Sequence, residues 1–295
     1  MRSFPTLDEF SVTFPNDVSF CQFLHSQQVF YSSITCSGCG QNIGLTLDGL
    51  SFMCHQRSCP KRSHRISYRY GTFFYQSSLS CIQIMKLGLF WLSKASVEST
   101  ISLLGHSSKT VCNFFNHFRN LVSSALTLED KIIGGEGIEV AIDETKLGKR
   151  KYNRGHFVDG VWVLVGIEMI PNGNIFLMPL ENRSENTLSN LISQYVRPGS
   201  IIHTDMWRGY NGISSLGYHH LTVNHSLEFV NHDTGSCTNA AEGLNSGLKR
   251  RIPIRNRSRN FIEGHLMEYI WRRKYKSNLF DALIIALKDI HYDLE

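Results

Sequence analysis

The stretch IEVAIDE, residues 138–144, reads as a β-strand that ends on acidic residues, with Asp143 at its carboxyl end. It follows a glycine-rich break, IIGGEG (132–137), of the kind that separates domains. A second apolar stretch, SIIHTDMWRGY (200–210), also runs into an acid, Asp205. Two buried strands that each end on an aspartate predict a sheet with a polar site at one edge.

The residues around these two strands complete a mixed α/β domain. The stretch GVWVLVGIEMIPNGNIFLMPL (160–180) predicts a hairpin of two long strands around a Pro-Asn-Gly-Asn turn. A helix is expected from about residue 185 to 195, and HHLTV (219–223) is a further short strand. A helix that starts at Thr238 then carries a third acid, Glu242.

The three acids can meet because side chains at the carboxyl ends of neighbouring strands project into one crevice. The helix of Glu242 would pack on the sheet through an apolar stripe of Ala241, Leu244, Leu248 and Ile252.

Three converging carboxylates repel one another unless cations neutralise their charge, and Mg²⁺ prefers such oxygen ligands. Two ions roughly 3.5–4 Å apart can drive phosphoryl displacement, and Lys249, on the face of Glu242, would then contact phosphate. The alternative for each single acid is a solvated surface residue.

Positive charge is concentrated near the end of the chain. The 295 residues carry a formal net charge of +5, and ten of the thirty Lys and Arg residues lie between Lys249 and Lys276. Such a cluster favours a polyphosphate partner, although a solvated basic face remains the alternative.

Four of the eight cysteines form two close pairs, CSGC (36–39) and CHQRSC (54–59), separated by 14 residues. This spacing predicts a tetrahedral Zn²⁺ site of Cys36, Cys39, Cys54 and Cys59. The second pair is wider than usual, so His55 or His64 could replace one cysteine. A pair of disulfides is the other alternative, disfavoured if the protein is intracellular.

An intracellular protein is expected because MRSFPTLDEF has Asp8 and Glu9 where a secretory signal would be positive. No apolar run has the roughly 18–20 residues of a membrane span.

Two stretches in the first half have helical periodicity. Residues 16–30 are amphipathic, with Asp17 as a candidate N-cap. Residues 89–119 have a helix-turn-helix rhythm: one helix stops at Gly105, and Ser107 or Ser108 can cap the next. As a DNA reader, its second helix would expose Ser108, Lys109, Asn113 and Asn116. The alternative is an ordinary pair of packed helices.

Over most of its length the chain resembles the Merlin-type DDE transposases and their ISXO-like bacterial insertion-sequence relatives, of the ribonuclease H-like superfamily. The residues that carry the resemblance are SYRYGTFFYQSSLS (67–80), IDETKLGKRKYNRGH (142–156), HTDMWRGYNGI (203–213) and TNAAEGLNSGLKRRI (238–252). The spacings also suit the family, at 205 − 143 = 62 positions and 242 − 205 = 37 positions.

The resemblance implies that Asp143, Asp205 and Glu242 are the catalytic triad, with Asn239 as an alternate or neighbouring ligand. Residues implied to hold the DNA phosphates are Lys249, Lys149, Arg150, Lys151, Arg250 and Arg251. Relatives usually carry an aromatic residue shortly after the glutamate, where this chain has Leu244 and Asn245.

The expected fold class is α/β, a ribonuclease H-like mixed-sheet catalytic domain preceded by a zinc ribbon and a helix-turn-helix-like region. The expected segments are an N-terminal helical segment (1–34), the ribbon (35–75), the helical DNA-binding region (76–130), the catalytic domain (131–260) and C-terminal helices (261–295).

The function implied is that of a cut-and-paste DNA transposase with Mg²⁺ or Mn²⁺ in the catalytic site and structural Zn²⁺. Its partners would be the terminal inverted repeats, target DNA and further copies of itself, with no membrane. It would act in the nucleus of a eukaryote and otherwise in the cytoplasm. The alternative is a domesticated or decayed transposase that binds specific DNA without cutting it.

Overall fold

The computed structural model describes residues 3–47, 49–148, 160–223 and 237–292. Lys149, Arg150 and Lys151, expected to contact DNA, lie outside the described residues. The chain divides into two compact units, Met1–Ala125 with Tyr275–Glu295, and Leu126–Lys274. Each unit is described by itself.

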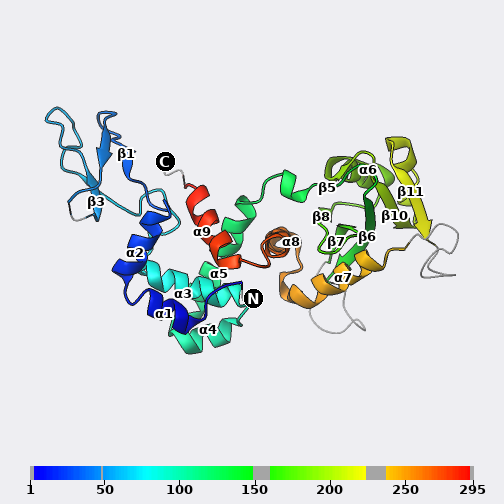
Figure 1. Cartoon of the computed structure of the whole chain (residues 1–295), viewed down its shortest axis with the longest axis horizontal. Helices are drawn as coiled ribbons and strands as arrows, with labels where there is room; N and C mark the ends of the chain where they lie inside the picture. Colours follow the sequence, from blue (N-terminus) through cyan, green and yellow to red (C-terminus); the bar gives the residue numbers. More distant parts are fainter. Residues whose placement is uncertain (1–2, 48, 149–159, 224–236, 293–295) are drawn as a thin grey trace. The chain divides into compact units, whose positions relative to one another are not determined.

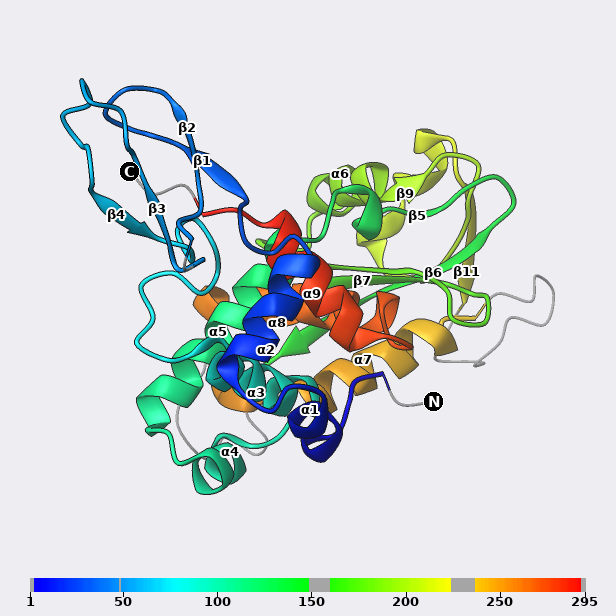
Figure 2. The same cartoon turned by 60° about the vertical axis from the view of Figure 1, so that its left-hand side comes forward.

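The first unit combines helices with two short antiparallel hairpins (Figure 2). Its helices are α1 (Leu7–Thr13), α2 (Asp17–Ser26), α3 (Cys81–Leu92), α4 (Val97–Leu104), α5 (Ser108–Ser124) and α9 (Leu279–Asp289). Its strands are β1 (Ser33–Thr35), β2 (Asn42–Gly44), β3 (Ser51–Met53) and β4 (Arg65–Ser67). β1 pairs with β2 and β3 pairs with β4.

Local side-chain chemistry sets the ends of these helices. α4 ends at Gly105, which adopts the left-handed conformation (φ 71°), and the Ser107 side chain caps α5 by accepting the N–H of Thr110. The expected cap of α2 is wrong by one residue, since Asn16 accepts the Ser19 N–H in that role. Asp17 instead accepts the backbone N–H of Ile82 at 2.8 Å, tying α2 to the start of α3.

The second unit is built around one five-stranded sheet. Its strands are β6 (Glu139–Leu147), β7 (Val161–Glu168), β8 (Ile175–Leu180), β10 (Ile201–Asp205) and β11 (His219–Val223), with a small pair of β5 (Ile133–Gly134) and β9 (Val196–Arg197). Its α-helices are α6 (Glu185–Tyr195), α7 (Asn239–Arg251) and α8 (Arg259–Lys274). Short 3₁₀ turns are η1 (Glu129–Lys131), η2 (Arg208–Tyr210), η3 (Ile213–Leu216) and η4 (Ile254–Asn256).

The strand order of the sheet is β11-β10-β6-β7-β8. β11, β10 and β6 run parallel, whereas β7 and β8 continue from β6 as an antiparallel meander. A mixed sheet of this kind fits a ribonuclease H-like domain. The expected hairpin of residues 160–180 is therefore confirmed as β7 and β8.

Strand β6 is longer than the sequence predicted. It continues past Asp143 to Leu147, because β7 pairs with it along its whole remaining length, as far as Val161. On its other side the parallel pairing with β10 stops at His203↔Ala141. Asp143 therefore lies within a strand, at a point where only one neighbour is still paired.

Helices cover both faces of the sheet (Figure 1). Val140 and Ile142 of β6 point into a core shared with Leu188 and Ile192 of α6. Because side chains alternate along a strand, Ala141 and Asp143 point to the other face, where α7 packs on β6 and β7. In the part of the chain that the structure describes, no helix is long and apolar enough to cross a membrane.

Candidate active site

Asp143 and Asp205 lie on adjacent parallel strands, two residues beyond the last paired positions, His203 and Ala141. Each aspartate stands an even number of residues after its paired position, so both side chains point to the face that α7 covers. Backbone N–H groups hold both carboxylates: Glu144 donates to Asp143 Oδ1 at 2.7 Å, and Trp207 donates to Asp205 Oδ1 at 2.9 Å. The expected neighbouring strands for the two aspartates are confirmed.

Helix α7 reaches this pair of aspartates through Asn245. The Asn245 amide Nδ2 donates to Asp143 Oδ2 at 2.7 Å, although the two residues are 102 positions apart in the chain. Glu242 stands three residues before Asn245 and Lys249 four residues after it, so all three follow one stripe of the helix. Asn239, Glu242 and Lys249 are exposed, whereas Asn245 is buried.

Glu242 is not drawn into a tight ligand group with the aspartates. Within the described ranges, the acid, His and Cys groups whose ligand atoms all lie within 4.8 Å of one another are Cys36–Cys39–Cys54–Cys59 and Asp17–Cys21–Cys81. The structure thus brings Asp143 and Asp205 onto one face and places Glu242 one helical turn from the residue that contacts Asp143.

The donor atoms at this face suit a divalent cation of the Mg²⁺ type. Carboxylate and amide oxygens are the ligands that Mg²⁺ prefers. The Oδ1 atom of Asn245 is buried and has no hydrogen-bond partner among the described residues. A buried acceptor without a partner is rare in native proteins, and a cation or its hydration water would satisfy it. The residues present therefore fit such an ion.

Arg183 stacks between two indole rings and forms an ion pair with Glu144, the residue after Asp143. The Arg183 guanidinium lies 4.3 Å from the ring centroid of Trp162 and 4.4 Å from that of Trp207, distances typical of cation–π contacts. Its Nε is 3.4 Å from Glu144 Oε1, and the Glu144 side chain is only 2% exposed. Because the Trp207 N–H also holds Asp205, the stack fixes the backbone that orients this aspartate.

Tyr210 of η2 is affected by the charges of Glu144, Asp143 and Asp205. Its side chain is buried, and its pKa is raised well above the ordinary value, first by burial and then by the charges of Glu144, Asp143 and Asp205. The hydroxyl also interacts with Glu144, but without the geometry of a normal hydrogen bond. Three carboxylates therefore act on one buried phenol.

The basic residues in the last turn of α7 are accessible. Lys249, Arg250 and Arg251 are exposed at the end of the helix, and the Arg251 guanidinium lies 5.4 Å from the ring centroid of Tyr269. Arg257 is occupied within the protein, since it donates to the carbonyl oxygens of Ile252 and Lys249. The exposed side chains form a positive surface on the helix that carries Glu242.

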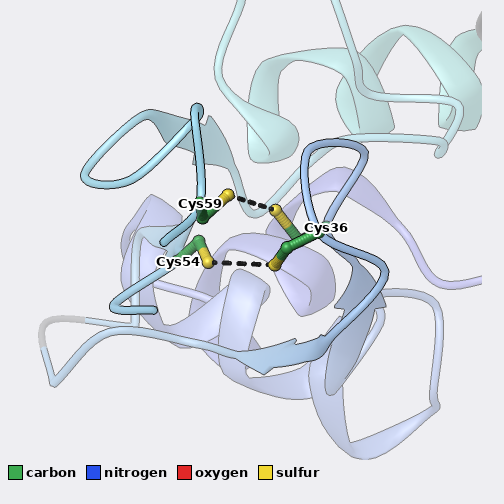
Figure 3. A group of neighbouring side chains, drawn as sticks. Cys36, Cys54 and Cys59 are labelled. Atoms are coloured by element: carbon green, nitrogen blue, oxygen red, sulfur yellow. Dashed lines mark hydrogen bonds between the residues drawn. The ribbon is translucent and has the colours of Figure 1, made fainter. Parts of the chain in front are cut away.

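The four expected zinc ligands come together in the first unit (Figure 3). The Sγ atoms of Cys36 and Cys59 are 3.6 Å apart, as are those of Cys39 and Cys54. A disulfide needs about 2.05 Å, so these are free thiols. The group is compatible with a tetrahedral structural zinc site.

Backbone donors already favour thiolate at part of this cluster. N–H groups of Gly38 and Cys39 lower the pKa of Cys36 to about 6, whereas burial raises the pKa of Cys59 to about 12. His55 and His64, weighed as substitute ligands, do not belong to the group. Cysteine is the ligand type that the structure assembles here.

The family model described as ISXO2-like transposase domain matches residues 126–278. The chain belongs to the ISXO2-like transposase family. The match begins with the second unit at Leu126 and extends just beyond its end at Lys274. A search of curated proteins found no significant match.

Sequence reasoning missed several residues of this transposase domain that contact or adjoin the aspartates: Glu144, Arg183, Trp207, Tyr210 and Asn245. Two signals were available. Glu144 follows Asp143 directly, and Trp207 and Tyr210 stand within five residues of Asp205. Arg183 carried no such signal, because its contact with Glu144 spans 39 positions.

Replacement of Glu144 by glutamine in the transposase should change how stability depends on pH. Burial raises the pKa of Glu144 above its ordinary 4.5, and the charge of Asp205 adds to this, against the opposing charge of Arg183. A carboxyl with a raised folded pKa contributes stability that is fully present below the unfolded value and is lost as pH rises through the folded value. The free energy of unfolding of wild type, relative to that of Glu144→Gln, should therefore fall as pH rises from 4.5 upward.

Urea unfolding of both proteins across this pH range measures the effect. Glu181→Gln, at an exposed position, is the matched control and should follow wild type at every pH. The prediction would be contradicted if the plots of unfolding free energy against pH ran parallel for wild type and Glu144→Gln.

Proposed function

We propose that this chain is a DNA transposase of the cut-and-paste DDE type, which binds the ends of its element and performs phosphodiester hydrolysis and strand transfer. The observation that carries the proposal is the placement of Asp143 and Asp205 on one face of adjacent parallel strands, within the domain that matches the family. An isolated surface acid has no reason to share a face with a second one, because like charges repel.

Asp143, Asp205 and Glu242 would hold the divalent cations. When bound there, Mg²⁺ or Mn²⁺ supplies the charge that activates an attacking oxygen and stabilises the leaving oxygen of an in-line displacement. The protein's own part is to fix the ligands: the Glu144 N–H and the Asn245 amide hold Asp143, and the Trp207 N–H holds Asp205. Ligands held in this way need little reorganisation when substrate arrives.

DNA would run along the positive surface beside the acids. Lys249 shares the stripe of Glu242, and the exposed Arg250 and Arg251 extend this surface toward neighbouring phosphates. The loop residues Lys149, Arg150 and Lys151, outside the described residues, would add to it. Contacts of this kind bind the DNA backbone without regard to sequence and weaken steeply with salt.

Recognition of the element's ends would fall to the first unit. Ser108, Lys109, Asn113 and Asn116 are all exposed on α5, the second helix of the helix-turn-helix-like pair. Zn²⁺ held by Cys36, Cys39, Cys54 and Cys59 would make the ribbon rigid. Joining two ends to one target needs two active sites, so the working complex would contain at least two copies. A eukaryotic host would place this activity in the nucleus, and a bacterial host in the cytoplasm.

Two single substitutions on α7 test which residue completes the metal site. Glu242→Ala should lower Mg²⁺-dependent cutting of DNA carrying the element's ends by on the order of 10³-fold, as expected if about 4 kcal/mol of charge stabilisation is lost. Asn239→Ala should stay within about tenfold of wild type, the lower end of what loss of a supporting residue costs. Both side chains are exposed, so both variants should fold.

The assay uses end-labelled duplex with the element boundary at its centre and scores the cut strand. The reverse result, with Asn239→Ala inactive and Glu242→Ala active, would move the third ligand to Asn239. Full activity in both variants would contradict the proposed site on α7.

A further inference from the structure

Asn245 is a polar residue at a position where the surrounding helix is apolar. It belongs to the face of α7 that packs on the sheet, together with Ala241, Leu244 and Leu248. Only 6% of its surface is exposed. A leucine would fit the chemistry of this stripe better, because an amide must lose its water to be buried there.

The buried amide is only half satisfied. Nδ2 donates to Asp143 Oδ2 at 2.7 Å, while Oδ1 is fully buried and has no hydrogen-bond partner among the described residues. Exchange of the two amide atoms would not help, since Oδ1 would then face the Asp143 carboxylate and Nδ2 would lack an acceptor. The arrangement becomes favourable only when a positive or hydrogen-donating species sits beside Oδ1.

A divalent cation on Asp143 is such a species. Amide oxygens are ordinary partners of Mg²⁺ and of the waters it retains. The two Asp143 oxygens accept hydrogen bonds from the Glu144 backbone N–H and from Asn245 Nδ2, and a carboxylate oxygen that accepts a hydrogen bond can also bind a cation. The same amide can thus hold the ligand and face the ion.

We propose that Asn245 is a positioning residue of the divalent-cation site, with Nδ2 orienting Asp143 and Oδ1 turned to the cation or its hydration water. The inference rests on the proposed function, because it takes Asp143 as a metal ligand. It adds a fourth member to the set predicted from the sequence.

The test measures Mn²⁺ binding to the full chain by electron paramagnetic resonance of free Mn²⁺, and the rise in melting temperature that Mn²⁺ produces. Asn245→Leu should keep or raise the melting temperature without metal, since it removes a half-satisfied amide. Its Mn²⁺ dissociation constant should rise about 10- to 100-fold, as found when a residue supporting a metal ligand is lost. The stabilisation by Mn²⁺ should shrink accordingly.

Asn245→Asp gives the opposite pattern. A second carboxylate beside Asp143 should lower the melting temperature without metal. The variant should bind Mn²⁺ as tightly as wild type or more tightly. Ser246→Ala, on an exposed position of the same helix, is the control and should match wild type in both measurements.

Asn245→Leu with a wild-type Mn²⁺ dissociation constant would overturn the inference and leave Asn245 as a packing residue. Asp143→Asn separates this failure from a failure of the proposed function. If Asp143→Asn loses Mn²⁺ and Asn245→Leu does not, only the inference fails. If neither variant loses Mn²⁺, the metal site of the proposed function fails as well.

Discussion

Asp205→Asn should reduce DNA cutting by on the order of 10³-fold or more, because a ligand that stabilises several kcal/mol of transition-state charge is lost. Asparagine has the same shape as aspartate and keeps an oxygen for the Trp207 N–H, which holds Asp205 at 2.9 Å. The variant should therefore fold normally. Binding to DNA should be retained, since the exposed basic residues that would contact phosphate are unchanged.

Asp130→Asn is the matched control for this substitution. Its carboxylate lies in the same unit and forms an ion pair with Lys274. Like Asp205→Asn, this substitution replaces one aspartate by asparagine and removes one negative charge. It should cost some stability and leave cutting close to wild type. Cutting by Asp205→Asn at the wild-type rate would contradict the catalytic role of Asp205.

Removal of zinc should unfold the cysteine-rich hairpins of residues 33–67. The buried core under the cluster consists of Ile43 and Phe52 with three of the cysteines themselves, and each of the four strands has three residues. So little apolar burial cannot offset the entropy of ordering the segment. Bound Zn²⁺ contributes about 10–16 kcal/mol in comparable small sites.

Limited proteolysis with and without a zinc chelator, together with metal analysis of the purified protein, measures this effect. Cys59→Ser should make the segment sensitive to protease even with zinc present. Cys112→Ser, an exposed cysteine on α5, should contain one zinc per chain and resist cleavage like wild type. A metal-free protein with an intact, protease-resistant ribbon would contradict the zinc site.

The positions of Asp143 and Asp205 could be predicted because each depends on a short local pattern, an apolar run that ends on an acid. Neighbouring strands then follow from general rules for α/β sheets. The length of β6 could not be predicted in this way. Its residues from Glu144 to Leu147 become strand through pairing with β7, which is a long-range contact.

Two side chains near the aspartates, Asn245 and Arg183, could not be predicted for the same reason. The contact of Asn245 with Asp143 and that of Arg183 with Glu144 join residues far apart in the chain. Nothing in the residues near Arg183 marks it as the partner of two indole rings. Local patterns therefore indicate where charged ligands stand, whereas tertiary packing decides which side chains hold them.

The most direct test of a DDE transposase is the cutting of a duplex that carries the element's end together with its flanking DNA. In Mg²⁺, the protein should cut the phosphodiester at the element boundary, leave a free 3′-hydroxyl and join that hydroxyl to an added target duplex. The same reaction in EDTA should give no product. Cutting that ignores the element boundary, or that persists in EDTA, would contradict the account.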